Sequence, residues 1–207
     1  MGQKTFLFDL DGTLTESMPV VLKIIDIISK EYKFKIDKGA VLDILRNKGI
    51  KKVFEKFKIP FYKIPGLVRK YRIEYKKEIP FLKPAEGIKA AIIKLKDAGV
   101  KIGIITTNGK DNLVDFLKFN QLDLFDYIYA DVGIFGKSKA LKKIIKFYRL
   151  DPSHTFYIGD ETRDIESAKK AGIKSIAVTW GVQTRVSLQE ENPDYIVDNS
   201  DELLSIN

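Results

Sequence analysis

Short apolar runs alternate with helical segments through the second half of the chain, and this rhythm restricts the fold more than any other feature. Short apolar runs of this kind are typical of strands buried on both faces. Strands joined through helices need crossover connections, which make them parallel neighbours in one sheet. The sequence therefore predicts a doubly wound, Rossmann-like α/β core. The expected strands are 5–8, 100–105, 127–130, 155–158, 175–178 and an edge strand at 195–197, and the expected helices between them are 85–98, 110–119, 138–148 and 162–171.

Residues 16–83 show no strand pattern and predict an all-helical domain inserted after the first strand. Ser17 and Pro19 favour a helix start before a broad apolar stripe, because proline suits the first helical turn. Asp37 is a second capping residue. We expect a core domain of residues 1–15 and 84–207 and a helical cap domain of residues 16–83. The helices expected in the cap are 20–32, 37–45, 50–57 and 67–78.

The whole chain has a formal net charge of +8, and its positive excess lies entirely in this insert. Residues 16–83 hold 18 Lys and Arg against 8 Asp and Glu, a net charge of +10, so the rest of the chain carries −2. Such a charge could steer anionic substrates, or it could come from lysines on solvated helix faces. A basic nucleic-acid-binding module is a third interpretation, which we disfavour because the sequence contains no recognised nucleic-acid motif.

The chain contains no cysteine, which excludes disulfides, thiolate nucleophiles and Cys-ligated metals. No apolar run approaches the roughly 20 residues of a membrane span, and no signal-peptide pattern opens the sequence. We expect a soluble, cytoplasmic protein with no membrane partner, as a monomer or a homodimer.

Two carboxylates follow the first apolar run, in the segment KTFLFDLDGTL at 4–14. Asp9 and Asp11 are two residues apart, and side chains at this spacing in a strand point the same way. The carboxyl ends of strands border the ligand crevice in open α/β sheets. Two close carboxylates need a cation or a shared proton to coexist. The alternative is a capping acid followed by a turn acid, because Asp-Gly is a common turn dipeptide.

Further polar side chains follow the later strands or begin the next helix. The segment KIGII precedes two threonines and an asparagine, and YIG precedes two aspartates about one helical turn apart. FGKSKAL begins a helix with two lysines. Each of these residues alone is more often structural or solvated, so their weight comes from their common position and their order. They are Thr106, Thr107, Asn108, Lys137, Lys139, Asp160 and Asp164.

Together, DLDGTL and these segments resemble the motifs of the haloacid dehalogenase (HAD) superfamily, over essentially the whole chain. The resemblance implies a phosphatase in which Asp9 attacks phosphorus and becomes an aspartyl-phosphate. Asp11 would protonate the leaving oxygen and then deprotonate water. Thr106 and Lys137 would neutralise the transferred phosphoryl group. Superfamily members that cleave carbon–halogen bonds lack an acid at the position of Asp11, so the resemblance favours the phosphatase branch.

The resemblance also implies a Mg²⁺ cofactor. Its ligands would be the Asp9 carboxylate, the backbone carbonyl of Asp11, the Asp160 carboxylate, the phosphate and waters. Asp164 would orient the ligand waters or Asp160 without binding the metal itself. One departure concerns the lysine motif, in which proline usually follows the lysine. Here Ser138 follows Lys137, so Lys139 remains an alternative.

Within the superfamily, the position of the insert is that of a helical C1 cap. The segments GDETRDIESAKKAGI and SIAVTWG resemble phosphoglycolate phosphatase-like and pyrophosphatase-like hydrolases. A small phosphorylated metabolite is the expected substrate, and a sugar phosphomutase stays open because it keeps both acids of the first motif. Thr107 and Asn108 are expected to contact substrate. Arg46, in a basic break between two cap helices, is a candidate for substrate selection or an ordinary solvated loop residue.

Overall fold

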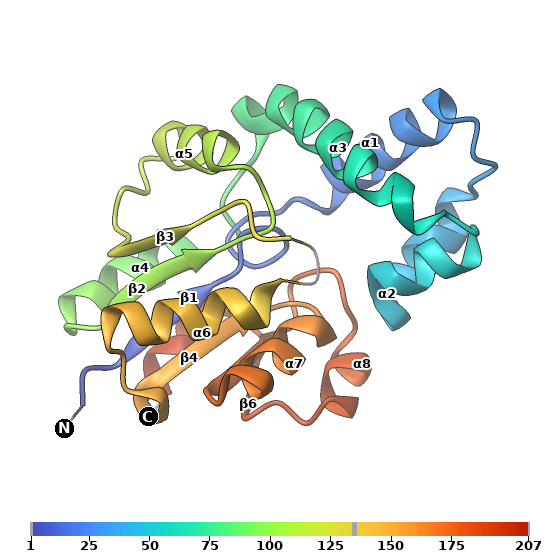
Figure 1. Cartoon of the computed structure of the whole chain (residues 1–207). Helices are drawn as coiled ribbons and strands as arrows, with labels where there is room; N and C mark the ends of the chain where they lie inside the picture. The colour runs from blue at the N-terminus through green and yellow to red at the C-terminus, as the bar shows by residue number, and fades with distance from the viewer. Residues whose placement is uncertain (1, 134–135, 207) are drawn as a thin grey trace.

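The computed structural model describes residues 2–133 and 136–206. Six parallel strands form one sheet in the order β3-β2-β1-β4-β5-β6, which confirms the expected doubly wound core (Figure 1). The first strand of the sequence lies at the centre, where it pairs with β2 on one side and β4 on the other. The strands are β1 (Thr5–Phe8), β2 (Lys101–Ile105), β3 (Tyr127–Tyr129), β4 (Thr155–Gly159), β5 (Lys174–Val178) and β6 (Tyr195–Val197).

The direction of winding changes between β1 and β4, because β2 and β3 extend the sheet one way and β4, β5 and β6 the other. Phe8, the last residue of β1, is in register with Ile104 and Ile158. The three strands therefore end at nearly the same level. Their carboxyl ends form the crevice in which open α/β sheets bind ligands.

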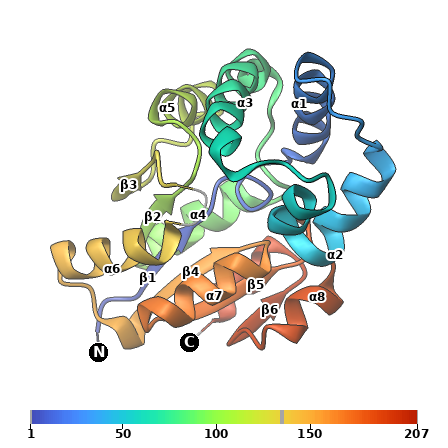
Figure 2. The same cartoon turned by 45° about the vertical axis from the view of Figure 1, so that its right-hand side comes forward.

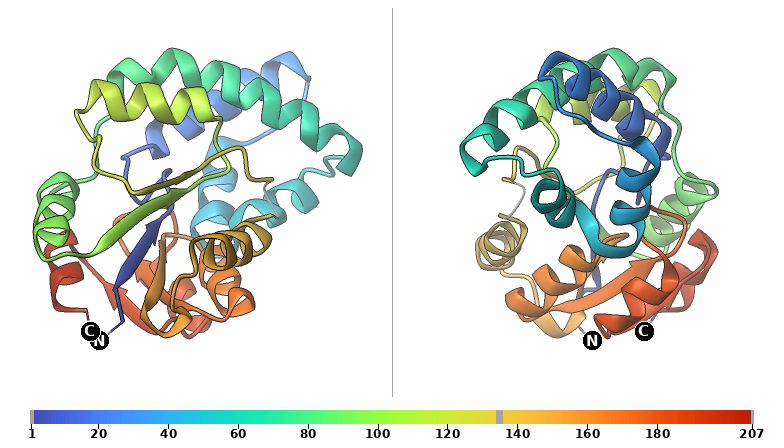
Figure 3. Two further views of the ribbon diagram at one scale, coloured as in Figure 1. Left: turned by 60° about the vertical axis from the view of Figure 1, so that its left-hand side comes forward. Right: turned by 90° about the vertical axis from the view of Figure 1, so that its right-hand side faces the viewer.

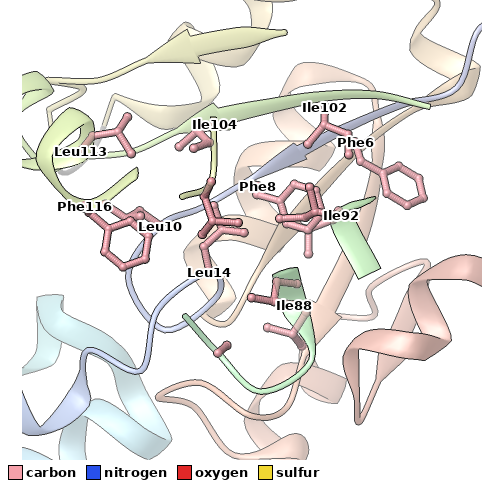
Figure 4. Close-up of a cluster of buried hydrophobic side chains, with 14 of the residues drawn as sticks. Phe6, Phe8, Leu10, Leu14, Ile88, Ile92, Ile102, Ile104, Leu113 and Phe116 are labelled. Carbon is pink, nitrogen blue, oxygen red and sulfur yellow. The ribbon is translucent and has the colours of Figure 1, made fainter. Parts of the chain in front are cut away.

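Alternation along the buried strands divides the core between two faces of the sheet. Phe6 and Phe8 belong to a large cluster that also includes residues of β2, β4, α4 (Ile88–Asp97) and α5 (Lys110–Phe119) (Figure 4). Leu7 belongs to a second cluster, with residues of α6 (Lys137–Tyr148) and α7 (Thr162–Ala171). All three side chains are fully buried. Burial on both faces explains why these strands appear as continuous apolar runs.

A helical cap, as expected, lies over the end of the sheet at which β1 ends (Figures 2 and 3). Its helices are α1 (Met18–Glu31), α2 (Lys38–Lys56) and α3 (Ile64–Glu78). Asp37 caps α2, because its carboxylate accepts a hydrogen bond from the backbone N–H of Ala40 at 2.6 Å. The residues at which the core and cap domains divide stay a prediction. None of the helices in residues 2–133 and 136–206 combines the length and apolar character needed to cross a membrane.

Several element boundaries differ from those expected. The two helices expected at 37–45 and 50–57 are both present as the two parts of α2, but the first continues past residue 45 to a break in the backbone at Gly49. The helix expected from residue 85 begins only at Ile88, after a left-handed Gly87. A short helix that the sequence analysis missed, α8 (Arg185–Glu190), follows β5. It has only two buried residues, Ser187 and Leu188, too few for a helical pattern to be recognised.

Gly49 adopts φ 74° and ψ 176°, a backbone conformation that is essentially restricted to glycine. We predict that Gly49→Ala lowers the free energy of unfolding by about 1–3 kcal/mol. A Cβ at this position would also lie 3.3 Å from the Gln183 side-chain amide. Urea denaturation followed by circular dichroism measures the change.

Gly66→Ala is the matched control. Gly66 lies inside α3, and a Cβ added there would meet no other atom within 4 Å. Because alanine favours the helix over glycine, we expect this variant to gain up to about 1 kcal/mol. Equal stability of the two variants would contradict the argument from backbone conformation.

Candidate active site

Three buried aspartates meet where the strand order reverses. Asp9 follows β1 directly, Asp160 follows β4, and Asp164 lies in the first turn of α7. One carboxylate oxygen from each lies within 4.8 Å of the other two. The sheet thus brings together Asp9, Asp160 and Asp164, which are far apart in the sequence.

Glycines leave the space that these carboxylates occupy. A Cβ added to Gly12 or Gly181 would overlap the Asp160 carboxylate, and one added to Gly159 would overlap Asp164. The Asp160 oxygens accept hydrogen bonds from the Thr13 hydroxyl and the Val182 backbone N–H, at 3.0 and 2.8 Å. Close backbone approach and these two donors fix the direction of Asp160.

Lys137 begins α6, and its side chain is 2% exposed. Its Nζ lies 2.5 Å from Asp9 Oδ2 and 2.5 Å from Asp164 Oδ1. Burial by itself lowers the pKa of Lys137, but the negative charges of Asp164 and Asp9 outweigh it and hold the pKa well above its usual value. Lys139, the alternative in the sequence, is exposed. The structure therefore brings Lys137, and not Lys139, to the aspartates.

Burial is the main cause of the raised pKa values of Asp9 and Asp160, the aspartates that follow β1 and β4. It raises the pKa of Asp9 to about 7, with Lys137 acting against the shift and Asp164 adding to it. Burial also raises the pKa of Asp160 well above its usual value, and the neighbouring charges of Glu161, Asp164 and Asp9 act in the same direction. The positively charged side chains nearby therefore do not fully balance the negative charge of Asp9 and Asp160.

The donor set suits a hard divalent cation. Carboxylate oxygens are the ligands that Mg²⁺ prefers, and a cation would relieve the repulsion that raises the pKa of Asp160. Asp9 and Asp160 each have an oxygen in the cluster, while one oxygen of Asp164 is bonded to Lys137. The Asp11 carboxylate is outside this group of three among the described residues. Its expected contribution was a backbone carbonyl, which stays a prediction.

Asp11 contacts the cap through a residue that the sequence analysis did not identify. The hydroxyl of Tyr75, in α3, donates a hydrogen bond to Asp11 Oδ1 at 2.5 Å, and the Asn108 side-chain amide approaches Oδ2 at 3.4 Å. Burial raises the pKa of Asp11, and the hydrogen bond from Tyr75 opposes the rise. Tyr75 is fully buried in a helix rich in lysine. Its partner lies 64 residues earlier in the chain, so no local pattern indicates the contact.

The loop after β2 carries three of the expected site residues. Thr106 is fully buried, and its hydroxyl accepts a hydrogen bond from the Asn108 backbone N–H at 3.0 Å. Thr107 and Asn108 line the same cavity as Asp9 and Asp11. Arg72, a second cap residue that the sequence analysis missed, donates to the Thr107 carbonyl at 2.5 Å and to Asp131 Oδ1 at 2.7 Å. The cap therefore holds this loop directly.

Arg46 lies apart from these residues. Its side chain is exposed, and it is not among the described residues that line the cavity. Its backbone carbonyl accepts a hydrogen bond from the Thr184 N–H at 3.0 Å, which joins α2 to the start of α8. In this structure Arg46 contacts the core through its backbone.

A cavity of about 210 Å³ opens above the aspartates. Asp9, Asp11 and Asp160 line its lower part, and side chains of α1, α2 and α3 line the rest. The candidate site is therefore closed on one side by the sheet and on the other by the cap.

We predict that Lys137→Met lowers the free energy of unfolding by about 3–5 kcal/mol in the presence of EDTA. The substitution leaves two buried carboxylates without their shared ammonium group. Lys139→Met, the same change two residues later at an exposed position, should stay within about 0.5 kcal/mol of the parent. Denaturant unfolding measures both, and an unchanged stability of Lys137→Met would contradict the importance of the shared ion pair.

Mg²⁺ should raise the melting temperature of the protein. A ligand at 100 times its dissociation constant stabilises a protein by about 2.7 kcal/mol, which corresponds to roughly 5–10 °C for a chain of this size. Asp160→Asn should lose this increase, whereas Asp201→Asn, at an exposed position far along the chain, should keep it. Differential scanning fluorimetry with Mg²⁺ or EDTA tests the prediction. An equal increase in both variants would exclude Asp160 as a ligand.

Proteins of similar sequence and structure include phosphatases. The chain is 28% identical over 203 residues to a phosphoglycolate phosphatase of Synechococcus elongatus, which covers 97% of this chain and 95% of that protein. It is 27% identical over 212 residues to the pyrophosphatase PpaX of Bacillus mycoides, which covers 100% of this chain and 97% of that protein. A crystal structure described as a predicted phosphatase from Clostridium acetobutylicum has a TM-score of 0.85 at 24% identity, covering 99% and 98% of the two chains.

The family match includes the cap and the sheet up to β5, but not the edge strand β6. Residues 6–178 match the sequence profile described as haloacid dehalogenase-like hydrolase. This range contains Asp9, Asp11, Lys137 and Asp160, as well as all three cap helices. The sheet order, the arrangement of these side chains and the sequence match together show that the chain belongs to the haloacid dehalogenase-like hydrolase family.

Proposed function

We propose that this protein is a Mg²⁺-dependent phosphatase that hydrolyses the phosphate monoester of a small metabolite through an aspartyl-phosphate on Asp9. The observation that carries the proposal is the contact of Lys137 with Asp9 at the base of a cavity that also exposes Asp11. A nucleophile, a cation and a second acid at one point are what phosphoryl transfer to a carboxylate requires. The phosphoglycolate phosphatase and the pyrophosphatase among the relatives support the same chemistry.

Asp9 is oriented as a nucleophile by two hydrogen bonds. Its Oδ1 accepts from the Leu10 backbone N–H at 2.8 Å, and its Oδ2 accepts from Lys137 at 2.5 Å. Lys137 favours the ionised carboxylate, which is the form that attacks phosphorus. As the phosphoryl group is transferred, the same ammonium group neutralises its charge at no cost in reorganisation.

Asp11 acts as the acid and then as the base. Because burial raises its pKa, the carboxyl group retains a proton more readily than an exposed aspartate and can protonate the leaving alkoxide. The resulting carboxylate then accepts a proton from the water that attacks the aspartyl-phosphate. Tyr75 holds the Asp11 side chain throughout.

Asp160, Asp164 and Thr106 serve the binding of the metal and of the phosphoryl group. Asp9, Asp160 and the Asp11 backbone carbonyl would hold Mg²⁺, with Asp164 positioning Lys137 beside them. When bound, Mg²⁺ supplies positive charge against the nucleophile and the phosphoryl oxygens. Thr106, with the backbone N–H groups of the loop that follows it, would donate hydrogen bonds to the phosphoryl oxygens.

Pyrophosphate hydrolysis is a second candidate, because PpaX of Bacillus mycoides is 27% identical over the whole of this chain. The two reactions share the attack by Asp9 and differ in the leaving group. Release of phosphate from pyrophosphate and from monoesters, compared at equal concentrations with Mg²⁺ and with EDTA, distinguishes them.

We predict that Asp9→Asn lowers kcat by at least about a thousandfold, because an amide cannot replace the nucleophilic carboxylate. Asp11→Asn should retain the nucleophile and lose acid–base catalysis, which is worth about 10²–10⁴ in rate. With an aryl phosphate, whose leaving group needs little protonation, Asp11→Asn should accumulate phosphorylated enzyme. Intact-protein mass spectrometry after acid quench detects the added phosphoryl group.

Asp201→Asn serves as the control for these variants, since Asp201 lies on the surface. Circular dichroism confirms that each variant is folded before rates are compared. Full activity of Asp9→Asn, or a phosphoryl group attached to another residue, would refute the mechanism.

A further inference from the structure

The cavity above the aspartates continues into the interior of the cap, where its walls are apolar. Side chains of all three cap helices line this part. Most of them are only half-buried, because they face the cavity and do not pack fully against one another. The lining includes Val21, Ile25, Ile50, Val53, Phe54 and Val68.

Among the described residues that line the cavity, the only cationic side chains are those of Arg72 and Arg163. Arg72 forms an ion pair with Asp131 at 2.7 Å, and Arg163 forms one with Glu161 at 2.6 Å. Both lie beside the loops that carry the catalytic groups. Beyond these two arginines the described walls inside the cap carry no cation. A second anionic group that extended past them would be buried unpaired, which is strongly unfavourable.

The basic excess of the insert lies outside the cavity. Of the 18 Lys and Arg in residues 16–83, all but Lys63, Lys70 and Arg72 are exposed, and none of the lysines lines the cavity. The structure thus favours solvated helix faces as the origin of the +10 charge. The charge can attract anions to the protein without selecting a group inside the cap.

We propose that the substrate is a phosphate monoester of an apolar alcohol, whose aryl or branched alkyl group occupies the cap part of the cavity. The proposal rests on the phosphatase function proposed above and specifies its leaving group. The phosphoryl group would lie at Asp9 and Lys137, and the hydrocarbon would contact Ile50, Phe54 and Val68. The whole cavity measures about 210 Å³, which includes the part where the phosphoryl group would lie. Since an apolar cavity of about 150 Å³ suffices for benzene, the cap part has room for no more than about one ring.

The first test is a series of substrates for the unmodified protein with Mg²⁺. Burial of each added methylene should raise kcat/KM roughly fourfold along methyl, ethyl, propyl and butyl phosphate. We expect 2-phenylethyl phosphate to exceed phosphoglycolate by at least about a hundredfold, because phosphoglycolate has no hydrocarbon group to bury and its single carboxylate would face the apolar walls.

The second test fills the cavity. Val68→Phe places a ring where the hydrocarbon would lie, so the ratio of kcat/KM for 2-phenylethyl phosphate to that for methyl phosphate should fall at least about tenfold. Val186→Phe is the matched control, because Val186 is 67% exposed on α8 and does not line the cavity. This control should leave the ratio unchanged.

The possible failures are distinguishable. If no ester is hydrolysed, methyl phosphate and phosphoglycolate included, the phosphatase function is wrong and this proposal falls with it. If phosphoglycolate or methyl phosphate is hydrolysed as efficiently as 2-phenylethyl phosphate, the phosphatase function stands and the apolar leaving group is refuted. A ratio that Val68→Phe does not change refutes the assigned location. The substrate series decides the question even if Val68→Phe does not fold.

Discussion

The site depends on one buried ammonium group shared by two carboxylates. Lys137 lies between Asp9 and Asp164, so it joins the end of β1 to the first turns of α6 and α7. Without it, the buried carboxylates of Asp9, Asp160 and Asp164 would face one another without this compensating charge. Removal of one partner of a buried ion pair is costly because the other charge loses its compensation. Gly12, Gly159 and Gly181 leave the space into which the carboxylates of Asp160 and Asp164 fit, and the ammonium group of Lys137 offsets the repulsion that their close approach creates.

Much of the core and part of the site could be predicted from the sequence, for a specific reason. Asp9 and Asp160 follow buried strands, and topology alone brings the carboxyl ends of neighbouring parallel strands together. Tyr75 and Arg72 could not be predicted in this way, because their contacts depend on where α3 lies over the sheet. The helix α8 escaped prediction because most of its side chains are exposed.

The first two lysines of α6 show that side-chain direction decides which residue belongs to the site. Lys137 and Lys139 are both compatible with the sequence motif, but they are two positions apart on a helix and therefore point in different directions. One is buried among carboxylates and the other is exposed. Arg46 lies in α2, three residues before the break at Gly49, and its side chain is exposed. Side-chain direction, and not residue type, separates these cases.

The hydrogen bond between Tyr75 and Asp11 spans the boundary between α3 and the end of β1. Any outward swing of α3 must break it, together with the contact of Arg72 to Thr107. One helix, α3, therefore both lines the cavity and holds the group proposed to transfer protons. If α3 swung outward, molecules would enter and leave only while Asp11 lacked its hydrogen bond from Tyr75, and the return of α3 would restore that bond.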